Sequence, residues 1–201
     1  MIYQTREDRE RMDATKVRYA IADNGQRTLA DAVAGKDIFL GLSGADLLSP
    51  EMLKTMADKP LVFAMANPNP EIKPPVAKEA RADVVIGTGR SDYPNQINNV
   101  LCFPFLFRGA LDCGASEINE AMKKAAVYAI ADLAHEPVPE AVRTAYQNRD
   151  FTFGAEYLIP TPFDPRLISR IAPAVAKAAA ESGVAARPIA DLAAYAASLE
   201  K

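Results

Sequence analysis

The chain lacks several features that mark well-known classes of functional site. Its 201 residues include no tryptophan, a single histidine and two cysteines. One histidine cannot form the HxxxH pair of a zinc enzyme, and Cys102 and Cys113 do not have the CxxC spacing of a metal or redox site. The GxSxG segment of serine hydrolases is missing as well. These absences exclude the commonest zinc, dithiol and serine-nucleophile sites.

An excess of positive charge and long apolar runs are missing too. The formal net charge is −3 at pH 7 and the isoelectric point is near 5.3, which argues against a nucleic-acid partner. No apolar run approaches the ~20 residues that span a bilayer, and the first residues lack the apolar core of a signal peptide. Both cysteines lie among apolar residues and are predicted to be buried free thiols. We expect a cytoplasmic protein that binds neither nucleic acid nor membrane.

Short apolar runs that end in turn-forming segments characterise the first half of the chain. Such runs predict strands buried on both faces, and helical patterns stand between them. Strands and helices that alternate with short connections predict a parallel sheet. The predicted strands are 36–42, 61–66 and 83–87. The predicted helices are 6–23, 28–34, 50–57 and 74–80. Thr28 is the predicted N-cap of the second of these helices and Ser49 that of the third.

The second half of the chain is predicted to be helical. Residues 99–112 form a helix that Pro104 kinks or restarts, and Ser116 is predicted to cap a long amphipathic helix, 117–135. Further helices are expected at 138–146, at 165–182 where Gly183 ends it, and near the C-terminus, with an irregular segment at 151–165. The predicted fold is α/β: a partial Rossmann-type parallel sheet with helices on both faces (1–115), followed by a helical C-terminal part (116–201) of the same domain.

Polar residues follow the three predicted strands at their carboxyl ends, where open parallel sheets bind ligands. Gly41–Ser43 follows the first strand, Asn67 the second and Gly87–Arg90 the third. Each break taken alone also fits a plain turn, and Asn98-Asn99 also fits a helix N-cap. The phosphate-binding GxGxxG segment is absent, and His135 is interpreted as a surface or capping residue. The residues alone therefore predict a ligand-binding domain without a complete catalytic set.

Long segments of the sequence resemble the NAD(P)-binding domain of bacterial malic enzymes, of the type that can be fused to a phosphotransacetylase-like domain. The resemblance is strongest in Phe63–Glu71, Ile86–Val100 and Phe103–Leu111. It continues through Ala115–Asn119, Phe153–Pro160, Pro162–Arg166, Ile171–Ala179 and Ser182–Ala185, and so covers practically the whole chain.

The resemblance implies a set of binding residues and a reaction. Asn67 and Asn99 would hold malate and the nicotinamide end of NADP or NAD, and Asn98 would lie beside them. Gly41, Leu42 and Ser43 would border the ribose and phosphates of the cofactor. The family oxidises and decarboxylates malate to pyruvate and CO2 with NAD(P)+ and Mg2+ or Mn2+, and it implies a homo-oligomer.

The resemblance assigns no catalytic residue and no metal ligand to this chain. In the family the general base, the general acid, the metal carboxylates and the glycine-rich loop all lie upstream of the matched region. We therefore expect a fragment, truncated at its N-terminus, that is inactive alone and binds dinucleotides weakly. Two alternatives stay open: another 2-hydroxy-acid dehydrogenase, and a non-catalytic interaction module that uses the Ala-rich C-terminal helices. The preference between NAD and NADP is open too.

Overall fold

The computed structural model describes residues 14–146 and 151–200. The chain forms two compact units, one ending at Val85 and the other beginning at Ile86. The boundary between them falls inside the third strand.

The first unit is built on parallel strands. β1 (Ile38–Gly41), β2 (Leu61–Ala64) and β3 (Val85–Thr88) follow one another in the sheet in that order. β1 and β2 are parallel, with Ile38 opposite Leu61, and the N–H of Val85 donates to the carbonyl of Pro60 at 3.0 Å. The predicted parallel sheet of Rossmann type is confirmed, with each strand shorter than its apolar run.

Four helices belong to the first unit: α2 (Ala14–Val17), α3 (Leu29–Val33), α4 (Pro50–Lys54) and α5 (Pro74–Ala80). The predicted caps are confirmed. The Thr28 hydroxyl accepts from the N–H of Asp31 in a capping box, and the Ser49 hydroxyl accepts from the N–H of Met52 at 3.2 Å. These caps satisfy donors that the first helical turn leaves free.

The predicted helix at 6–23 is wrong beyond Val17. Residues 1–13 lie outside the described part of the chain, and the helix that is seen, α2, ends at Val17. Val17, Tyr19 and Ile21 are spaced by two residues, so they cannot share one face of a helix. All three are about half exposed or more, and none contributes to a core.

The two faces of β1 have different environments. Phe39 pairs with Val62, and Gly41 pairs with Ala64, and these four residues are buried on one face of the sheet. On the other face Ile38 and Leu40 are 53% and 65% exposed. The period of two that the strand geometry imposes therefore separates a buried from an open side.

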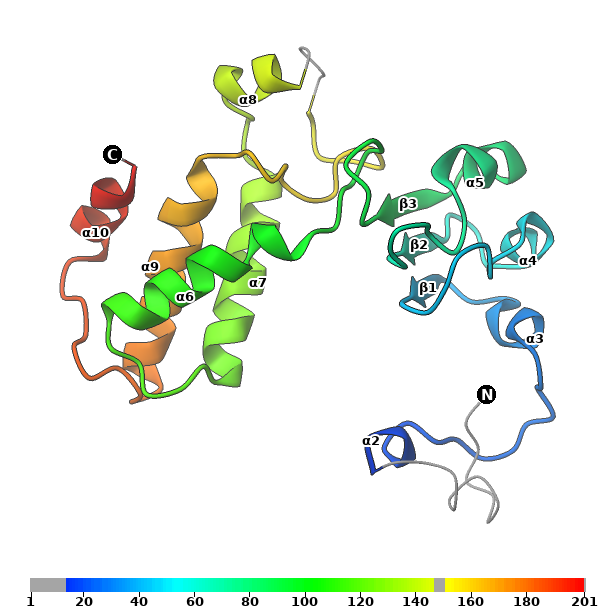
Figure 1. Ribbon diagram of the computed structural model, residues 1–201, viewed down its shortest axis with the longest axis horizontal. Helices are drawn as coiled ribbons and strands as arrows, with labels where there is room; N and C mark the ends of the chain where they lie inside the picture. Colours follow the sequence, from blue (N-terminus) through cyan, green and yellow to red (C-terminus); the bar gives the residue numbers. More distant parts are fainter. Residues whose placement is uncertain (1–13, 147–150, 201) are drawn as a thin grey trace. The chain divides into compact units, whose positions relative to one another are not determined.

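The second unit is a helical bundle. Its helices are η1 (Asn99–Leu101), α6 (Phe103–Asp112), α7 (Glu120–Ala134), α8 (Glu140–Ala145), α9 (Arg166–Glu181) and α10 (Leu192–Leu199). α9 packs against α6, α7 and α10 (Figure 1). The buried side chains of this core include Met122, Leu133, Leu167, Ile171 and Val175. Pro104 restarts the helix after η1, and α9 ends before Gly183, whose φ of +77° suits glycine. Both predictions are confirmed.

The predicted start of the long helix is wrong by three residues. α7 begins at Glu120, and its N-cap is Asn119, whose Oδ1 accepts from the N–H of Met122 at 3.1 Å. Ser116 instead donates its N–H to the carbonyl of Val184 at 3.0 Å. Ser and Asn are both good caps, and the contacts of 116–119 with residues 182–184 select the later one.

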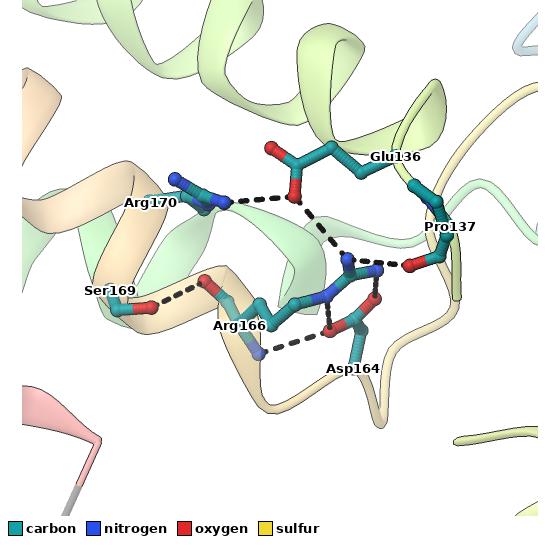
Figure 2. A network of polar contacts seen from close by, with 6 residues as sticks. All are labelled: Glu136, Pro137, Asp164, Arg166, Ser169 and Arg170. Atoms are coloured by element: carbon teal, nitrogen blue, oxygen red, sulfur yellow. Dashed lines mark hydrogen bonds and ion pairs between the residues drawn. The ribbon is translucent and has the colours of Figure 1, made fainter. Parts of the chain in front are cut away.

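A network of charged residues joins the end of α7 to the start of α9 (Figure 2). The guanidinium of Arg166 donates to both carboxylate oxygens of Asp164, at 3.0 and 2.8 Å, and to the carbonyl of Pro137 at 3.0 Å. Glu136 accepts from Arg170 at 2.8 Å and from Arg166 at 3.4 Å. The Asp164 side chain is fully buried, so a planar fork of donors satisfies a carboxylate that water does not reach.

The remaining predictions for this unit are confirmed in outline. Residues 151–165 contain only an isolated bridge between Gly154 and Tyr157. Cys102 and Cys113 are free thiols as predicted; Cys113 is buried, whereas Cys102 is only partly buried, so the prediction of burial is wrong for Cys102. Burial raises the pKa of the Cys102 thiol. His135 is exposed at the C-cap of α7, where its ring stacks on Phe153 at 3.8 Å between centroids.

Candidate functional site

The carboxyl ends of β1 and β2 bring the first two predicted binding segments together within one unit. Gly41 is buried as the last residue of β1, and Leu42 and Ser43 are exposed directly after it. Asn67 is exposed three residues after the end of β2, and its side-chain amide makes no hydrogen bond to any described residue. An uncommitted amide offers one donor group and one acceptor to a ligand.

A buried carboxylate, which the sequence analysis did not predict, links these two segments. Glu71 is fully buried. Its Oε1 accepts from the N–H of Ser43 at 3.0 Å, and its Oε2 accepts from the N–H of Ala66 at 3.1 Å. The donor Ser43 is one of the predicted cofactor residues, and the donor Ala66 directly precedes Asn67. One side chain therefore connects the turn after β1 to the turn after β2.

Gly41 is required by the position of this carboxylate. A Cβ on residue 41 would lie 2.7 Å from Oε2 of Glu71 and closer still to the other carboxyl atoms. The glycine of the predicted cofactor turn therefore leaves room for the protein's own carboxylate. Glycine lets another group approach the backbone closely, and at Gly41 that group is the side chain of Glu71.

Backbone hydrogen bonds strengthen the same connection. The N–H of Met65 donates to the carbonyl of Gly41 at 3.0 Å, and the N–H of Leu48 donates to the carbonyl of Glu71 at 3.0 Å. The N–H of Asp46 donates to the carbonyl of Pro70 at 3.1 Å. The segments 41–48 and 65–71 are thus joined along their length, which fixes both predicted binding segments on one framework.

The other two predicted binding residues lie in the second unit. Asn98 and Asn99 are exposed at the start of η1. The Oδ1 of Asn98 accepts from the N–H of Val100 at 3.0 Å, so Asn98 is the N-cap of η1, the alternative that the sequence left open. The side-chain amide of Asn99 has no hydrogen bond within the described residues. Asn99 is therefore the more available of the two for a ligand.

The third strand end is used mainly for packing. A Cβ on Gly87 would lie 2.9 Å from Cδ1 of Ile97 and 3.1 Å from the carbonyl oxygen of Asn95. Thr88 is fully buried, and Arg90 is paired with Asp92 at 2.7 Å. Gly87 lies within β3, and close packing against Ile97 and Asn95 explains the glycine.

Asn95, which was not among the predicted binding residues, organises the second unit near this strand. Its Nδ2 donates to the carbonyls of Ile86 at 3.0 Å and Ala155 at 2.8 Å. Its Oδ1 accepts from the N–H of Leu158 at 2.8 Å. Its φ is +54°, a conformation that asparagine tolerates better than most residues. The Pro94-Asn95 turn signal was the available clue.

A pocket of about 370 Å³ lies beside Asn95. Aromatic side chains form much of its wall, with ring centroids 5.5 Å apart for Tyr146 and Phe151 and 5.0 Å apart for Phe151 and Tyr157. Burial, followed by the nearby charge of Asp164, raises the pKa of Tyr157 to about 12. None of the predicted binding residues lines this pocket.

The described part of the chain contains neither a metal-ligand cluster nor a membrane-spanning helix. Among residues 14–146 and 151–200, no three His, Cys, Asp or Glu side chains are grouped so that they could hold a metal ion. None of the helices there is long and apolar enough to cross a membrane. The groups that are available for a ligand at the strand ends are amides and backbone.

A parallel α/β sheet with an uncommitted amide after one of its strands is typical of the α/β proteins that bind ligands at the carboxyl edge of the sheet. Comparisons with known proteins agree. The family described as malic enzyme, NAD binding domain, matches residues 4–145. The chain therefore belongs to the malic enzyme family, as part of its NAD-binding domain.

Individual relatives support the same assignment. The chain is 64% identical over 195 residues to the NADP-dependent malic enzyme of Haemophilus influenzae, covering 97% of this chain and 26% of that protein. It is 60% identical over 195 residues to the NAD-dependent malic enzyme of Rhizobium meliloti, covering 97% of this chain and 25% of that protein. The crystal structure of the Entamoeba histolytica malic enzyme matches with a TM-score of 0.78 and 30% identity, over 99% of this chain and 39% of that one. The chain spans about a quarter of the length of the two bacterial enzymes.

Proposed function

We propose that this chain is the cofactor- and substrate-positioning part of a malic enzyme, which oxidises and decarboxylates malate to pyruvate and CO2 with NAD(P)+. The observation that carries the proposal is the uncommitted amide of Asn67 at the carboxyl end of β2, in a chain of this family. Parallel sheets bind their ligands at that edge.

The proposed role of the two amides is to orient malate against the cofactor. An asparagine amide donates to a carboxylate oxygen and accepts from a hydroxyl without adding charge. The side-chain amides of Asn67 and Asn99 make no hydrogen bond to described residues, whereas the Oδ1 of Asn98 already accepts from the N–H of Val100. We therefore assign the contacts with malate and the nicotinamide amide to Asn67 and Asn99, and only an adjacent role to Asn98.

The turn after β1 fits the cofactor side of such a site. Leu42 is 78% exposed and Ser43 is exposed, so both residues are accessible to a ligand, while the N–H of Ser43 is bound by Glu71. A nicotinamide, when bound, supplies the acceptor for the hydride that leaves C2 of malate. The described residues do not form a carboxylate cluster for Mg2+ or Mn2+, and none of them is assigned to a metal.

The proposal is tested by grafting this chain into the Haemophilus influenzae enzyme in place of its matched segment. The grafted enzyme is expected to reduce NADP+ in the presence of malate and to release pyruvate. Asn67→Ala and Asn99→Ala should each raise the KM for malate about tenfold or more, because each removes hydrogen bonds to a charged substrate. Asn69→Ala, an exposed neighbour in the same segment, is the matched control and should change little.

The same experiment separates the alternatives. A folded grafted enzyme that oxidises other 2-hydroxy acids and not malate would favour a different dehydrogenase. Unchanged malate kinetics in both Asn67→Ala and Asn99→Ala would remove these residues from the substrate site. The 201-residue chain alone is expected to show no malate-dependent NADPH formation, and detection of that activity would contradict the assignment of this chain as a positioning part.

We further propose that the protein is a cytoplasmic homo-oligomer, with α6 contributing to the interface. Phe103, Phe107 and Leu111 occur at intervals of four along this helix, so they share one face, and they are 62%, 44% and 69% exposed. Two free cysteines suit a reducing compartment. Light scattering after size exclusion tests the interface: Phe107→Glu should shift the grafted enzyme towards the monomer, and an unchanged mass would contradict it.

A further inference from the structure

We propose that Glu71 is a positioning residue for hydride transfer, which sets the spacing between the cofactor turn after β1 and the substrate amide after β2. The inference rests on the proposed function of these two segments. Glu71 itself is fully buried, so it acts through the backbone of Ser43 and Ala66.

The first support is the place of the two donors. Ser43 is the last of the three residues assigned to the cofactor, and Ala66 directly precedes Asn67. A side chain that binds both N–H groups, at 3.0 and 3.1 Å, sets the spacing of these two residues within the framework that the backbone bonds provide. Each segment also has its own strand, so the carboxylate controls only the final residues after the strands end.

The second support is the presence of two acceptors in one side chain. Each oxygen of Glu71 accepts from one turn, Oε1 from Ser43 and Oε2 from Ala66. None of the described cationic side chains forms an ion pair with Glu71, so these two backbone N–H groups are the described partners of its carboxyl group. A single rigid carboxyl group therefore joins the two turns.

The third support is the fit of the surrounding residues to the carboxylate. Gly41 leaves the volume that the carboxyl group fills, and the carbonyl of Glu71 accepts from the N–H of Leu48. The backbone and the side chain of Glu71 therefore engage the loop after β1 at two separate places. A residue that served folding alone would not need to contact the ends of both ligand-binding turns, as Glu71 does.

The test uses Glu71→Gln, which keeps the shape of the side chain and converts one acceptor into a donor. In the 201-residue chain, hydrogen exchange measured by NMR should show faster exchange of the Ser43 or Ala66 amide, whichever loses its acceptor. In the grafted enzyme kcat should fall by about tenfold to a hundredfold, since displacement of reacting groups by about 1 Å has that effect. The primary isotope effect with malate deuterated at C2 should increase, because hydride transfer becomes slower relative to the other steps.

The isotope effect distinguishes positioning from stability. Asp164→Asn is the matched control: it also removes a buried carboxylate, but one that holds Arg166 at the start of α9. It should lower the melting temperature and leave the isotope effect unchanged. Gly41→Ala is a second variant of the same contact, and it should change the isotope effect in the same direction as Glu71→Gln.

Two results would overturn the proposal. One is unchanged exchange at both amides in Glu71→Gln. The other is a grafted Glu71→Gln enzyme with a lower melting temperature and an unaltered isotope effect, since that pattern defines a purely structural residue. If the unmutated graft lacks malic enzyme activity, the proposed function fails, and amide exchange in the chain alone still decides whether Glu71 fixes the two turns.

Discussion

The phenol of Tyr195 donates a hydrogen bond of 2.7 Å to Oδ2 of Asp112, joining α10 to the last residue of α6. Arg108 donates to the same oxygen at 2.6 Å. Burial by itself would raise the pKa of Asp112, but the hydrogen bonds from Arg108 and Tyr195 lower it below its usual value. Burial and the same carboxylate raise the pKa of Tyr195, so the phenol remains a donor at neutral pH.

Tyr195→Phe is expected to lower the free energy of unfolding at pH 7 by about 1 kcal/mol, the net value of one hydrogen bond. Urea denaturation followed by circular dichroism measures it. Tyr128→Phe, at a side chain that is 67% exposed, is the control and should have no measurable effect. Equal losses in both variants would contradict a specific role of the Tyr195 hydroxyl.

The effect of Tyr195→Phe should depend on pH. A carboxyl group whose pKa is lowered in the folded state stabilises the fold above its unfolded pKa, about 3.9, and loses that contribution as the pH falls through the folded value. The difference between the variant and the unmutated chain should therefore be largest near neutral pH and shrink below about pH 4. A difference that grows on acidification would show that Asp112 is not the partner that matters.

Asp164→Asn should destabilise the second unit by about 3 kcal/mol, because Arg166 loses its bidentate partner in a largely buried place. Arg166 is 18% exposed and keeps Glu136 nearby, which limits the loss. The exposed pair Arg90–Asp92 provides the control: Asp92→Asn should cost less than about 1 kcal/mol. Thermal unfolding of the two variants side by side tests the contrast.

Gly109→Ala should lower stability although alanine favours helices. The intrinsic gain is about 1 kcal/mol. The added Cβ would collide with the backbone carbonyl of Ala172 and lie 3.0 Å from Cβ of Val175, where α6 packs on α9. Overpacking of this kind costs about 1–3 kcal/mol, more than the gain. Gly44→Ala, whose nearest neighbour is Leu47 at 3.6 Å, is the control for urea denaturation and should be close to neutral.

Asn95→Ala should be among the most damaging single substitutions, with a loss of about 3 kcal/mol or more. It removes three side-chain hydrogen bonds, at about 1 kcal/mol each, and leaves the buried carbonyl of Ile86 unsatisfied, which costs about 1–3 kcal/mol. Asn95→Asp separates the two kinds of bond, since it keeps the acceptor for Leu158 and loses both donors. If thermal unfolding shows equal loss for both variants, the bond to Leu158 contributes little.

Local patterns in the sequence predicted most of the elements. The caps at Thr28 and Ser49, the restart at Pro104 and the stop at Gly183 depend on residues within a few positions of each other. The start of α7 depended on a contact between distant segments: Asn119 also donates to Ser182 at 2.9 Å, 63 residues further along the chain. Spacing along the sequence does not contain that information.

The residues that follow the strands in the candidate site could be predicted from the sequence, whereas the buried carboxylate that joins them could not. Strand ends and turn residues pointed to Gly41, Ser43 and Asn67, because their chemistry is local. Nothing near Glu71 in the sequence indicates that its side chain is buried. Its partner Ser43 lies 28 positions earlier in the sequence, so the contact between Glu71 and Ser43 arises only when the two turns pack together.

The open side of β1 has a practical consequence for work on the isolated chain. β1 is at one edge of the sheet formed by the described strands, and its outward-facing Ile38 and Leu40 are exposed. An unpaired apolar edge recruits further strands from other molecules. Self-association should therefore depend on protein concentration, and dilution series belong in every binding or exchange measurement made on these 201 residues.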